Sequence, residues 1–387
     1  MGRILVITND FPPRCGGIET FIFALCARLP ADELVVLTSS TPGGAAFDAT
    51  LDFAVVRHRA AMLLPTPATA RLAERILRDH DCDRVLFGAA APLGLLAARL
   101  RQAGAQRVVA LTHGHEPGWA GVPLVRRALR RVADDCDALT YVSEFCRARL
   151  EPALSAPARH RLHPLMPGAD TDLFRPGCGG SRLRERLGIA PDRPVVLSAS
   201  RLVARKGQDQ LIHAMPAIAR AVPDALLLVV GTGPQRAQLE RLAQRVGAHR
   251  QVRFIGEVPW DEMPAWYDSA DVFVGPSRTR WAGIEPEALG IVYLEAQATG
   301  CPVIVGRSGG APETVRHGIT GYVVDPRDPS DIARRTVDLL SDPARRRRFG
   351  EAARTWAQTE WSWQRAAEQI GALLVDPRGK STYVRLP

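Results

Sequence analysis

The sequence predicts an α/β protein built from two Rossmann-like, doubly wound domains that face a common cleft. Stretches typical of strands and helices alternate along the chain, as in a parallel sheet with helices on both faces. The alternation stops around residues 163–177, where three prolines occur, and then restarts. A length of 387 residues suits two domains of ordinary size. The loops after the strands of both domains would line the cleft.

The first domain is expected over residues 1–170 and opens with a buried strand at 3–8. A helix should follow, because apolar residues recur on one helical face. These residues are Ile18, Phe21, Ile22, Leu25 and Leu29. Further strands are expected at 33–38, 84–87, 107–112 and 137–142.

The second domain is expected over residues 178–361. Short apolar runs bounded by turn residues predict its strands. They lie at 195–200, 225–230, 251–255, 271–275, 302–306 and 321–324. Three amphipathic, arginine-rich helices should end the chain, at about 328–340, 344–359 and 362–374.

Charge and composition narrow the class of ligand. The formal net charge is +9, and Lys206 and Lys380 are the only lysines among 50 basic residues. An excess of positive charge suits phosphate-bearing ligands, anionic membranes or nucleic acid. Aromatic residues make up only 6% of the chain and are not interleaved with basic runs. This pattern argues against a nucleic-acid-binding protein.

The distribution of cysteines and the lengths of the apolar segments indicate in which cellular compartment the protein resides. Seven cysteines are scattered without a C-x-x-C pair, which suits a reducing cytoplasm better than a disulfide framework or a zinc site. The first strand leaves no room for a signal peptide, and the apolar stretch at 85–100 is too short to span a bilayer. We therefore expect a cytoplasmic protein, at most peripheral on the inner face of the plasma membrane.

Two loops that follow strands carry features of phosphate binding. Gly16 and Gly17 precede the first helix, where backbone N–H groups and the helix dipole favour an anion. A tight turn without a ligand is an equally good explanation. Arg201 and Lys206 follow the first strand of the second domain and could clamp a diphosphate. The alternative is a solvated basic loop, but a lysine is unusual in this arginine-rich chain.

Two glutamates lie in the segment 274–315, which reads as strand, polar loop, helix, strand and glycine loop. Seven residues separate Glu287 from Glu295, so on one helix both carboxylates could address one side of a cleft. Glu287 would then lie in the first turn, where the helix dipole favours it even without a function. Glu295 is flanked by apolar residues and should be paired or serve a ligand.

Histidines and a basic stretch in the first domain are further candidates. His113 ends a strand and could hydrogen-bond a substrate. His113 and His115 could instead bind a metal, but no other ligand cluster has suitable spacing. The D-x-D patterns at 81–83 and 135–137 precede strands rather than follow them, so we do not expect a metal-nucleotide site there. The stretch 122–133 predicts a basic amphipathic helix, either on anionic lipid or simply on the protein surface.

These motifs together resemble the family 4 retaining glycosyltransferases of the GT-B fold. The resemblance covers nearly the whole chain and rests on segments that are individually weak but specific in combination. The segments are 8–18, 112–119, 200–209 and 289–315. It implies that GDP-mannose is the donor, that a phosphatidylinositol mannoside receives a second mannose through an α-1,6 linkage, and that no cofactor or metal takes part.

The resemblance also implies roles for individual residues. Arg201 and Lys206 would neutralise the departing diphosphate, and the backbone N–H of Gly17 would contact the same phosphates. Glu287 would hold hydroxyls of the transferred sugar. His113 would contact that sugar near its anomeric carbon.

Further donor and acceptor contacts follow from the same resemblance. Glu295 would accept hydrogen bonds from both ribose hydroxyls. The other donor-binding residues would be Gly256, Val258, Met263, Ile291 and Val292, and the acceptor side would include Asn9 and Asp10. A C-terminal helix within 362–387 would complete the first domain.

The chain departs from the family pattern at 280–290, where Arg-Trp-Ala-Gly-Ile-Glu-Pro-Glu-Ala-Leu-Gly replaces a glycine-rich run. Trp281 and Pro286 would change the shape around the donor sugar. One alternative is therefore a transferase that moves a sugar from another nucleotide to a soluble acceptor, such as an aminocyclitol or a natural-product core. Another is a sugar-nucleotide-binding protein without transfer activity.

Overall fold

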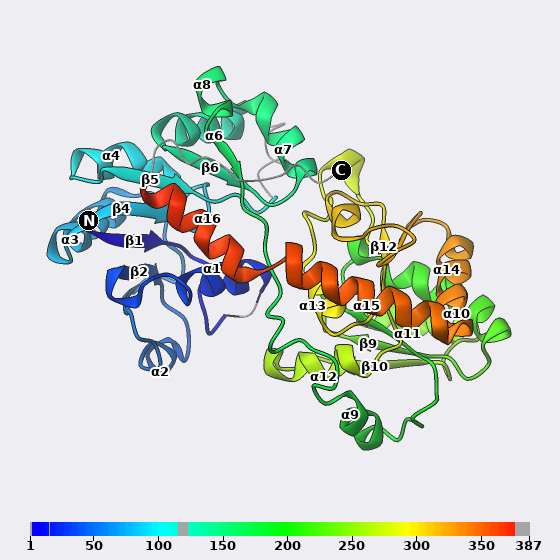
Figure 1. The fold of residues 1–387 in the computed structure, drawn as a ribbon. Coiled ribbons are helices and arrows are strands. Elements are labelled where there is room, and N and C mark those ends of the chain that lie inside the picture. Colours follow the sequence, from blue (N-terminus) through cyan, green and yellow to red (C-terminus); the bar gives the residue numbers. More distant parts are fainter. Residues whose placement is uncertain (1, 15, 115–122, 376–387) are drawn as a thin grey trace. The chain divides into compact units, whose positions relative to one another are not determined.

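A computed structural model describes residues 2–14, 16–114 and 123–375. The chain divides into two compact units, one formed by Met1–Pro167 with Trp363–Pro387 and the other by Gly168–Ser362. Each unit contains one parallel sheet with helices packed against it (Figure 1). The predicted α/β class is confirmed.

The first unit is built on a seven-stranded sheet of order β3-β2-β1-β4-β5-β6-β7. Its strands are β1 Arg3–Ile7, β2 Leu34–Ser39, β3 Ala54–His58, β4 Cys82–Phe87, β5 Arg107–Ala110, β6 Ala138–Tyr141 and β7 Leu162–Pro164. The five inner strands were predicted because they are nearly continuous buried apolar runs. The edge strands β3 and β7 were not predicted, because they are short, contain no fully buried residue, and include an arginine, histidines or a proline beside their few apolar residues.

Helices of the first unit include one from the far end of the chain. The helices are α1 Gly17–Cys26, α2 Gly44–Asp48, α3 Pro67–Asp79, α4 Ala97–Gln102, α6 Pro123–Asp135, α7 Glu144–Leu150, α8 Ala156–Arg159 and α16 Trp363–Val375. The red helix α16 lies against α1 and β5 (Figure 1). Phe21 of α1 meets the ring of Trp363 edge-on, with centroids 5.4 Å apart. Buried Arg107 donates from Nε to the carbonyl of Leu373 at 2.8 Å.

The second unit is built on a six-stranded sheet of order β10-β9-β8-β11-β12-β13. All six strands agree with the predicted ranges to within one residue. They are β8 Val195–Ala199, β9 Leu226–Val230, β10 Val252–Gly256, β11 Val272–Gly275, β12 Val303–Gly306 and β13 Gly321–Val324. The strand order changes direction between β8 and β11, and ligands of such sheets bind beyond the carboxyl ends of the strands at that point.

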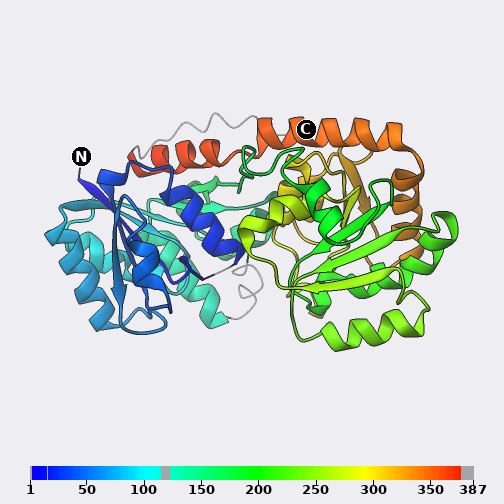
Figure 2. The same ribbon diagram turned by 90° about the horizontal axis from the view of Figure 1, so that it is seen from below.

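Helices cover both faces of this second sheet. They are α9 Gly180–Arg186, α10 Gln208–Ala221, α11 Arg236–Arg245, α12 Met263–Asp268, α13 Ile291–Ala298, α14 Pro329–Ser341 and α15 Pro343–Glu360. Helices α10 and α14 lie side by side, and the long orange helix α15 packs on α13 (Figures 1 and 2). Within the described ranges, no helix combines the length and the apolar character needed to cross a bilayer.

The packing of α16 on the first unit generates a stability prediction. Ile370 of α16 is fully buried, so Ile370→Ala should lower the free energy of unfolding of this unit by about 2–5 kcal/mol. Urea unfolding followed by tryptophan fluorescence measures the change. Glu368→Ala, on the exposed face of the same helix, should change it by less than about 0.5 kcal/mol. Equal effects of the two substitutions would contradict the packing of α16 on the first unit through Ile370.

Candidate active site

The site begins at the turn between β8 and α10, which carries Lys206. A 3-10 turn at Ala204–Lys206 ends at Gly207, whose φ is +76°. A Cβ atom on Gly207 would lie 2.0 Å from the carbonyl oxygen of Pro276. Only glycine therefore lets this turn approach the segment after β11 so closely. The approach brings Lys206 next to Glu287.

The prediction that Glu287 lies in the first turn of a helix is wrong. Helix α13 begins at Ile291, and Glu287 lies before it in an extended loop. The helix cannot start earlier in the same direction, because Gly290 caps it with a left-handed φ of +101°. The two glutamates are therefore not on one helical face, and each has a separate environment.

The glycine loop after β12 holds the backbone of Glu287. The N–H of Gly310 donates to the Glu287 carbonyl at 2.9 Å, and the N–H of Glu287 donates to Ser308 Oγ at 3.2 Å. Gly309 has a φ of +56°, and a Cβ atom there would lie 1.8 Å from the Glu287 carbonyl oxygen. The glycines of this loop are thus needed for backbone contact with the loop of Glu287.

The carboxylate of Glu287 is the centre of a buried ion cluster. Its Oε2 accepts hydrogen bonds from Lys206 Nζ at 2.6 Å, from Arg205 Nη1 at 2.8 Å and from Ser277 Oγ at 3.2 Å. Burial alone would raise the pKa of Glu287, but the charges of Lys206 and Arg205 outweigh it and lower the pKa to about 2. The carboxylate is therefore ionised at neutral pH. Sequence reasoning missed Arg205, although it precedes Lys206 in the same loop.

Positive charge is in excess around this cluster. The Arg201 side chain is exposed and has no hydrogen-bond or ion-pair partner among the described residues. Burial lowers the pKa of Lys206, the charges of Arg205 and Arg201 lower it further, and Glu287 opposes the shift. The carboxylate of Glu285 also lies near the cluster, with Oε1 3.8 Å from Arg205 Nε. The three cations Arg201, Arg205 and Lys206 thus still outnumber the two carboxylates, an arrangement that suits an anionic ligand.

Glu295 lies in a different environment, on α13 in the core of the second unit. It is 7% exposed, and its Oε2 accepts a hydrogen bond from the Tyr267 hydroxyl at 2.8 Å. Burial raises the pKa of Glu295 to about 7, against the opposing effect of hydrogen bonds from Tyr267 and Trp260. Glu295 therefore titrates near neutral pH. We expected Glu295 to be paired or to serve a ligand, and in the structure the hydroxyl of Tyr267 is a partner of its carboxyl group.

Two hydroxyl-bearing residues extend the hydrogen-bond network of Glu287. The Tyr293 hydroxyl lies 3.0 Å from Ser277 Oγ and 2.9 Å from the Gly275 carbonyl oxygen. Ser277 thus links Tyr293 to Glu287. Ser277, Tyr293 and Tyr267 were not predicted from the sequence. The two tyrosines lie among apolar residues and resemble ordinary core residues, and Ser277 resembles an ordinary loop serine.

Five further residues expected around the donor also belong to the second unit. Gly256 ends β10 with a φ of +102°, and Val258 follows it in the loop. Met263 is the first residue of α12, and Ile291 and Val292 open α13. All five lie at a strand end, in the loop beyond it or in the first turn of a helix, which is where α/β sheets bind ligands.

His113 and Gly17 belong to the first unit. His113 follows β5 and is buried, with Nε2 2.6 Å from the carbonyl oxygen of Gly88. A carbonyl only accepts, so Nε2 carries a proton and the ring is fixed in orientation. The ring meets Phe21 of α1 edge-on at 5.2 Å. Gly17 opens α1, and a Cβ atom there would meet no atom within 4 Å, so packing does not require this glycine.

Asn9 and Asp10 form the loop after β1. The side-chain amide of Asn9 donates to the Leu63 carbonyl at 3.0 Å and accepts from the Leu63 N–H at 2.6 Å. Asn9 therefore holds this loop against residue 63. The N–H of Asp10 donates to Thr8 Oγ1 at 3.0 Å.

The metal alternative involved His115, which lies outside the described residues. In the described part of the chain, no group of three or more histidine, cysteine, aspartate or glutamate side chains could hold a metal ion.

Comparisons with known proteins match both halves of the chain. Residues 15–173 match the family described as Glycosyltransferase Family 4, and residues 181–356 match Glycosyl transferases group 1. The chain is 47% identical to the GDP-mannose-dependent alpha-(1-6)-phosphatidylinositol monomannoside mannosyltransferase of Mycolicibacterium smegmatis, over 96% of this chain and 98% of that protein. It is 43% identical to a Corynebacterium glutamicum enzyme that acts on the monoacylated form, over 96% and 97% of the two chains.

Solved structures show the same fold at lower sequence identity. HepE of Anabaena in complex with UDP superposes with a TM-score of 0.80 at 20% identity, over 95% of this chain and 98% of that chain. Sucrose-phosphate synthase of Thermosynechococcus elongatus superposes with a TM-score of 0.78 at 23% identity, over 96% and 98%. The predicted GT-B fold is confirmed.

The raised pKa of Glu295 predicts a pH dependence of stability. A carboxyl whose pKa rises from 4.5 to about 7 on folding contributes most below pH 4.5, and this contribution is lost as the pH rises through 7. Without ligand, the free energy of unfolding of the wild type should therefore fall between pH 4.5 and 8, relative to Glu295→Gln, by up to roughly 3 kcal/mol.

Urea unfolding at a series of pH values measures this difference. Glu185→Gln, on an exposed position of α9, is the control and should follow the wild type. Parallel curves for the wild type and Glu295→Gln would show that Glu295 does not titrate in this range.

Proposed function

Because the chain belongs to the family 4 glycosyltransferases, we propose that it transfers mannose from GDP-mannose to a phosphatidylinositol mannoside, adding the second mannose through an α-1,6 linkage. Relatives of 43% and 47% identity over nearly the whole chain carry this activity in their names. The observation that carries the proposal at the site is the buried cluster of Glu287 with its excess of cations.

The geometry of the cluster supports a division of labour. Lys206, Arg205 and Ser277 all bind Oε2 of Glu287, which leaves Oε1 to accept hydrogen bonds from hydroxyls of the mannose. Lys206 and the unpaired Arg201 would neutralise the negative charge that develops on the diphosphate as it leaves. A cation held in place in a largely buried site, as Lys206 is, stabilises such a charge strongly, because little reorganisation is needed during the reaction.

Glu295 would bind the ribose of the donor. Hydroxyl donors favour the ionised carboxylate, so ribose binding would lower the raised pKa of Glu295. Binding of GDP below about pH 7 would then release a proton. The nucleobase would lie along the segment from Gly256 to Met263, with Val258 within it, and Ile291 and Val292 would contact the donor from the start of α13.

We place the remaining roles on the first unit. His113, held by Gly88, would contact the mannose near the anomeric carbon, and the N–H of Gly17 would bind the diphosphate. Asp10 and Asn9 would lie on the acceptor side. Configuration would be retained by attack on the face that the diphosphate leaves, with a phosphate oxygen taking the proton of the acceptor hydroxyl. No metal is invoked in this scheme.

An assay of mannose transfer from labelled GDP-mannose to phosphatidylinositol monomannoside tests this proposal. The wild type should form the dimannoside. Lys206→Ala should lower kcat by about 100- to 1,000-fold, because the leaving diphosphate loses a charged partner. Arg201→Gln should also lower kcat, and this exposed residue can be changed without disturbing the core.

Arg220→Gln on α10, another exposed arginine, is the control and should behave as the wild type. Thermal melting verifies that each variant is folded. Normal turnover by folded Lys206→Ala and Arg201→Gln would refute the diphosphate roles. Turnover of the wild type only with a uridine or adenosine sugar nucleotide would refute GDP-mannose.

We further propose that the protein reaches its lipid acceptor at an anionic membrane surface through α6. Its exposed face carries Arg126, Arg127 and Arg130, and Leu124 beside them is 78% exposed. Basic side chains next to an exposed apolar residue suit the boundary between lipid headgroups and acyl chains.

Replacing these three arginines of α6 with glutamine should weaken binding to anionic vesicles by roughly 100-fold, at about 1 kcal/mol for each charge. Cosedimentation with phosphatidylglycerol vesicles measures the effect. The control replaces three exposed arginines of the second unit, Arg241, Arg245 and Arg250. An equal loss of vesicle affinity in both triple variants would indicate an effect of net charge alone. Unchanged affinity of the α6 variant would show that α6 does not contact the membrane.

A further inference from the structure

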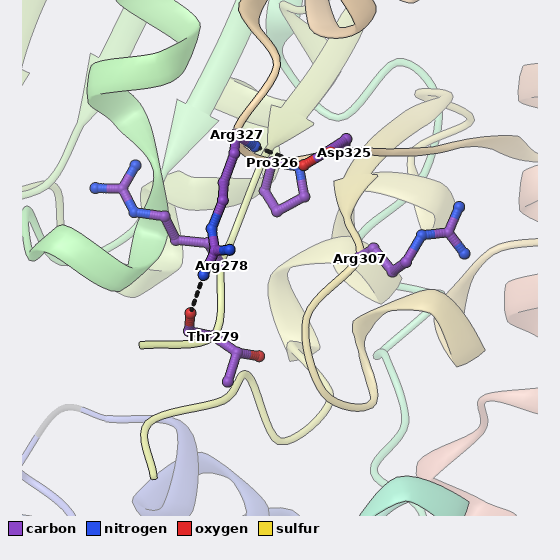
Figure 3. Close-up of a pocket in the computed structure, with 6 residues that line it drawn as sticks. All are labelled: Arg278, Thr279, Arg307, Asp325, Pro326 and Arg327. Atoms are coloured by element: carbon purple, nitrogen blue, oxygen red, sulfur yellow. Dashed lines mark hydrogen bonds between the residues drawn. The ribbon is translucent and has the colours of Figure 1, made fainter. Parts of the chain in front are cut away.

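A pocket of about 250 Å³ lies beyond the carboxyl ends of three neighbouring strands of the second unit. Its lining comes from the segments that follow β11, β12 and β13, and consists of Arg278, Thr279, Arg307, Asp325, Pro326 and Arg327. Figure 3 shows Arg307 on one side of the space, with Arg278, Thr279 and Arg327 on the other. Half of the lining residues are thus arginines.

Two of these arginines are not neutralised. Arg278 is paired, with Nη1 2.9 Å from the carboxylate of Asp209. Arg307 is exposed, and its side chain has no hydrogen-bond or ion-pair partner in the described ranges. Arg327 donates from Nη2 to the Thr279 carbonyl at 3.5 Å (Figure 3), and no carboxylate of a described residue lies within 4.0 Å of its guanidinium. Neither guanidinium is thus paired with a carboxylate of a described residue. The Arg327 guanidinium lies next to Thr279, and the exposed Arg307 side chain, drawn extending away from Arg278 and Arg327 in Figure 3, would have to turn toward the pocket to join it.

The single acid of the pocket does not cancel this charge. One oxygen of the Asp325 carboxylate accepts from the backbone N–H of Arg327 at 2.9 Å. This bond shapes the turn after β13 and involves the backbone of Arg327 rather than either guanidinium group. Guanidinium groups of this kind favour phosphate oxygens, to which they donate two parallel hydrogen bonds.

The pocket adjoins the cluster of Glu287 but is distinct from it. Thr279 Oγ1 lies 3.0 Å from Ser308 Oγ, and Ser308 Oγ accepts the N–H of Glu287. One wall of the pocket is thus two hydrogen bonds from the backbone of Glu287. Lys206 and Arg201, which we assign to the diphosphate of the donor, are not among its lining residues, and neither is Arg205.

We propose that this pocket is a second phosphate site, which binds the phosphodiester headgroup of a phospholipid through Arg307 and Arg327. The inference rests on the proposed function, because a phosphatidylinositol mannoside carries such a phosphodiester. The pocket is slightly smaller than the roughly 300–1,000 Å³ of sites for drug-sized ligands, so it suits a headgroup rather than a whole lipid. The headgroup belongs either to the acceptor or to the surrounding phospholipid.

The test compares the wild type with the double variant Arg307→Gln/Arg327→Gln. Glycerophosphoinositol, the deacylated headgroup, is the soluble probe, and isothermal titration calorimetry measures its binding. The double variant should bind it at least about tenfold more weakly, because each charge-assisted hydrogen bond contributes roughly 1.5–3 kcal/mol. The matched control is Arg220→Gln/Arg245→Gln, which removes two exposed arginines from α10 and α11 and should bind as the wild type does.

Kinetics and vesicles distinguish the two sources of the headgroup. If the acceptor supplies it, the KM for phosphatidylinositol monomannoside rises about tenfold or more. The kcat and the KM for GDP-mannose then stay within about twofold of the wild type, the margin set by a few tenths of a kcal/mol. If surrounding phospholipid supplies it, the double variant loses affinity for phosphatidylglycerol vesicles, and the KM of a short-chain acceptor in solution is unchanged.

Three results would overturn the proposal: equal binding of glycerophosphoinositol by the wild type and the double variant, equal loss in the control, or a rise in the KM for GDP-mannose alone. The binding measurement does not depend on turnover. If the wild type transfers no mannose to phosphatidylinositol monomannoside, the proposed function fails, and calorimetry still decides whether the pocket binds a phosphodiester.

Discussion

The second unit depends on the burial of one carboxylate, that of Glu287, among cations. An ionised carboxylate that is only 6% exposed would be very unfavourable without partners, and Lys206 and Arg205 supply them on a single oxygen. The close backbone contacts of Gly207 and Gly309 make this possible, because they bring three separate loops together. The ion pairs of Glu287 therefore depend on both the cations and the glycines. Loss of either would leave a buried charge without its partner.

The same residue type has opposite electrostatic behaviour at two positions of this site. Glu287 is surrounded by cations and has a pKa of about 2, whereas Glu295 is surrounded by aromatic side chains and has a pKa of about 7. Glu287 stays ionised at neutral pH and accepts hydrogen bonds from Lys206, Arg205 and Ser277. Glu295 changes its charge over the physiological range, so its state can respond to a ligand that donates hydrogen bonds. The second unit thus contains one glutamate that stays ionised and one whose charge depends on its surroundings.

Much of the fold could be predicted from the sequence, because buried parallel strands are nearly continuous apolar runs. The edge strands β3 and β7 lack that signal. Some environments around the candidate site agree with the sequence: Lys206, unusual in this arginine-rich chain, binds Glu287, and Glu295, flanked by apolar residues, is buried. The position of Glu287 outside a helix was not predicted, because the spacing of the two glutamates fits a helix equally well and does not reveal that Gly290, with a left-handed φ of +101°, caps α13 after Glu287. The hydrogen bond of the Tyr267 hydroxyl was not predicted either, because its partner, Glu295, lies 28 residues further along the chain.

The position of α16 has a consequence for the order of folding during synthesis. Domains generally fold as they leave the ribosome, the N-terminal one first. Here the first unit contains Trp363–Val375, which is translated after the whole of the second unit. At usual translation rates the nascent first unit waits roughly 10–40 s for this helix. During that time the surfaces of α1 and β5 that α16 covers are open to chaperones, and the second unit is the first to acquire its complete set of elements.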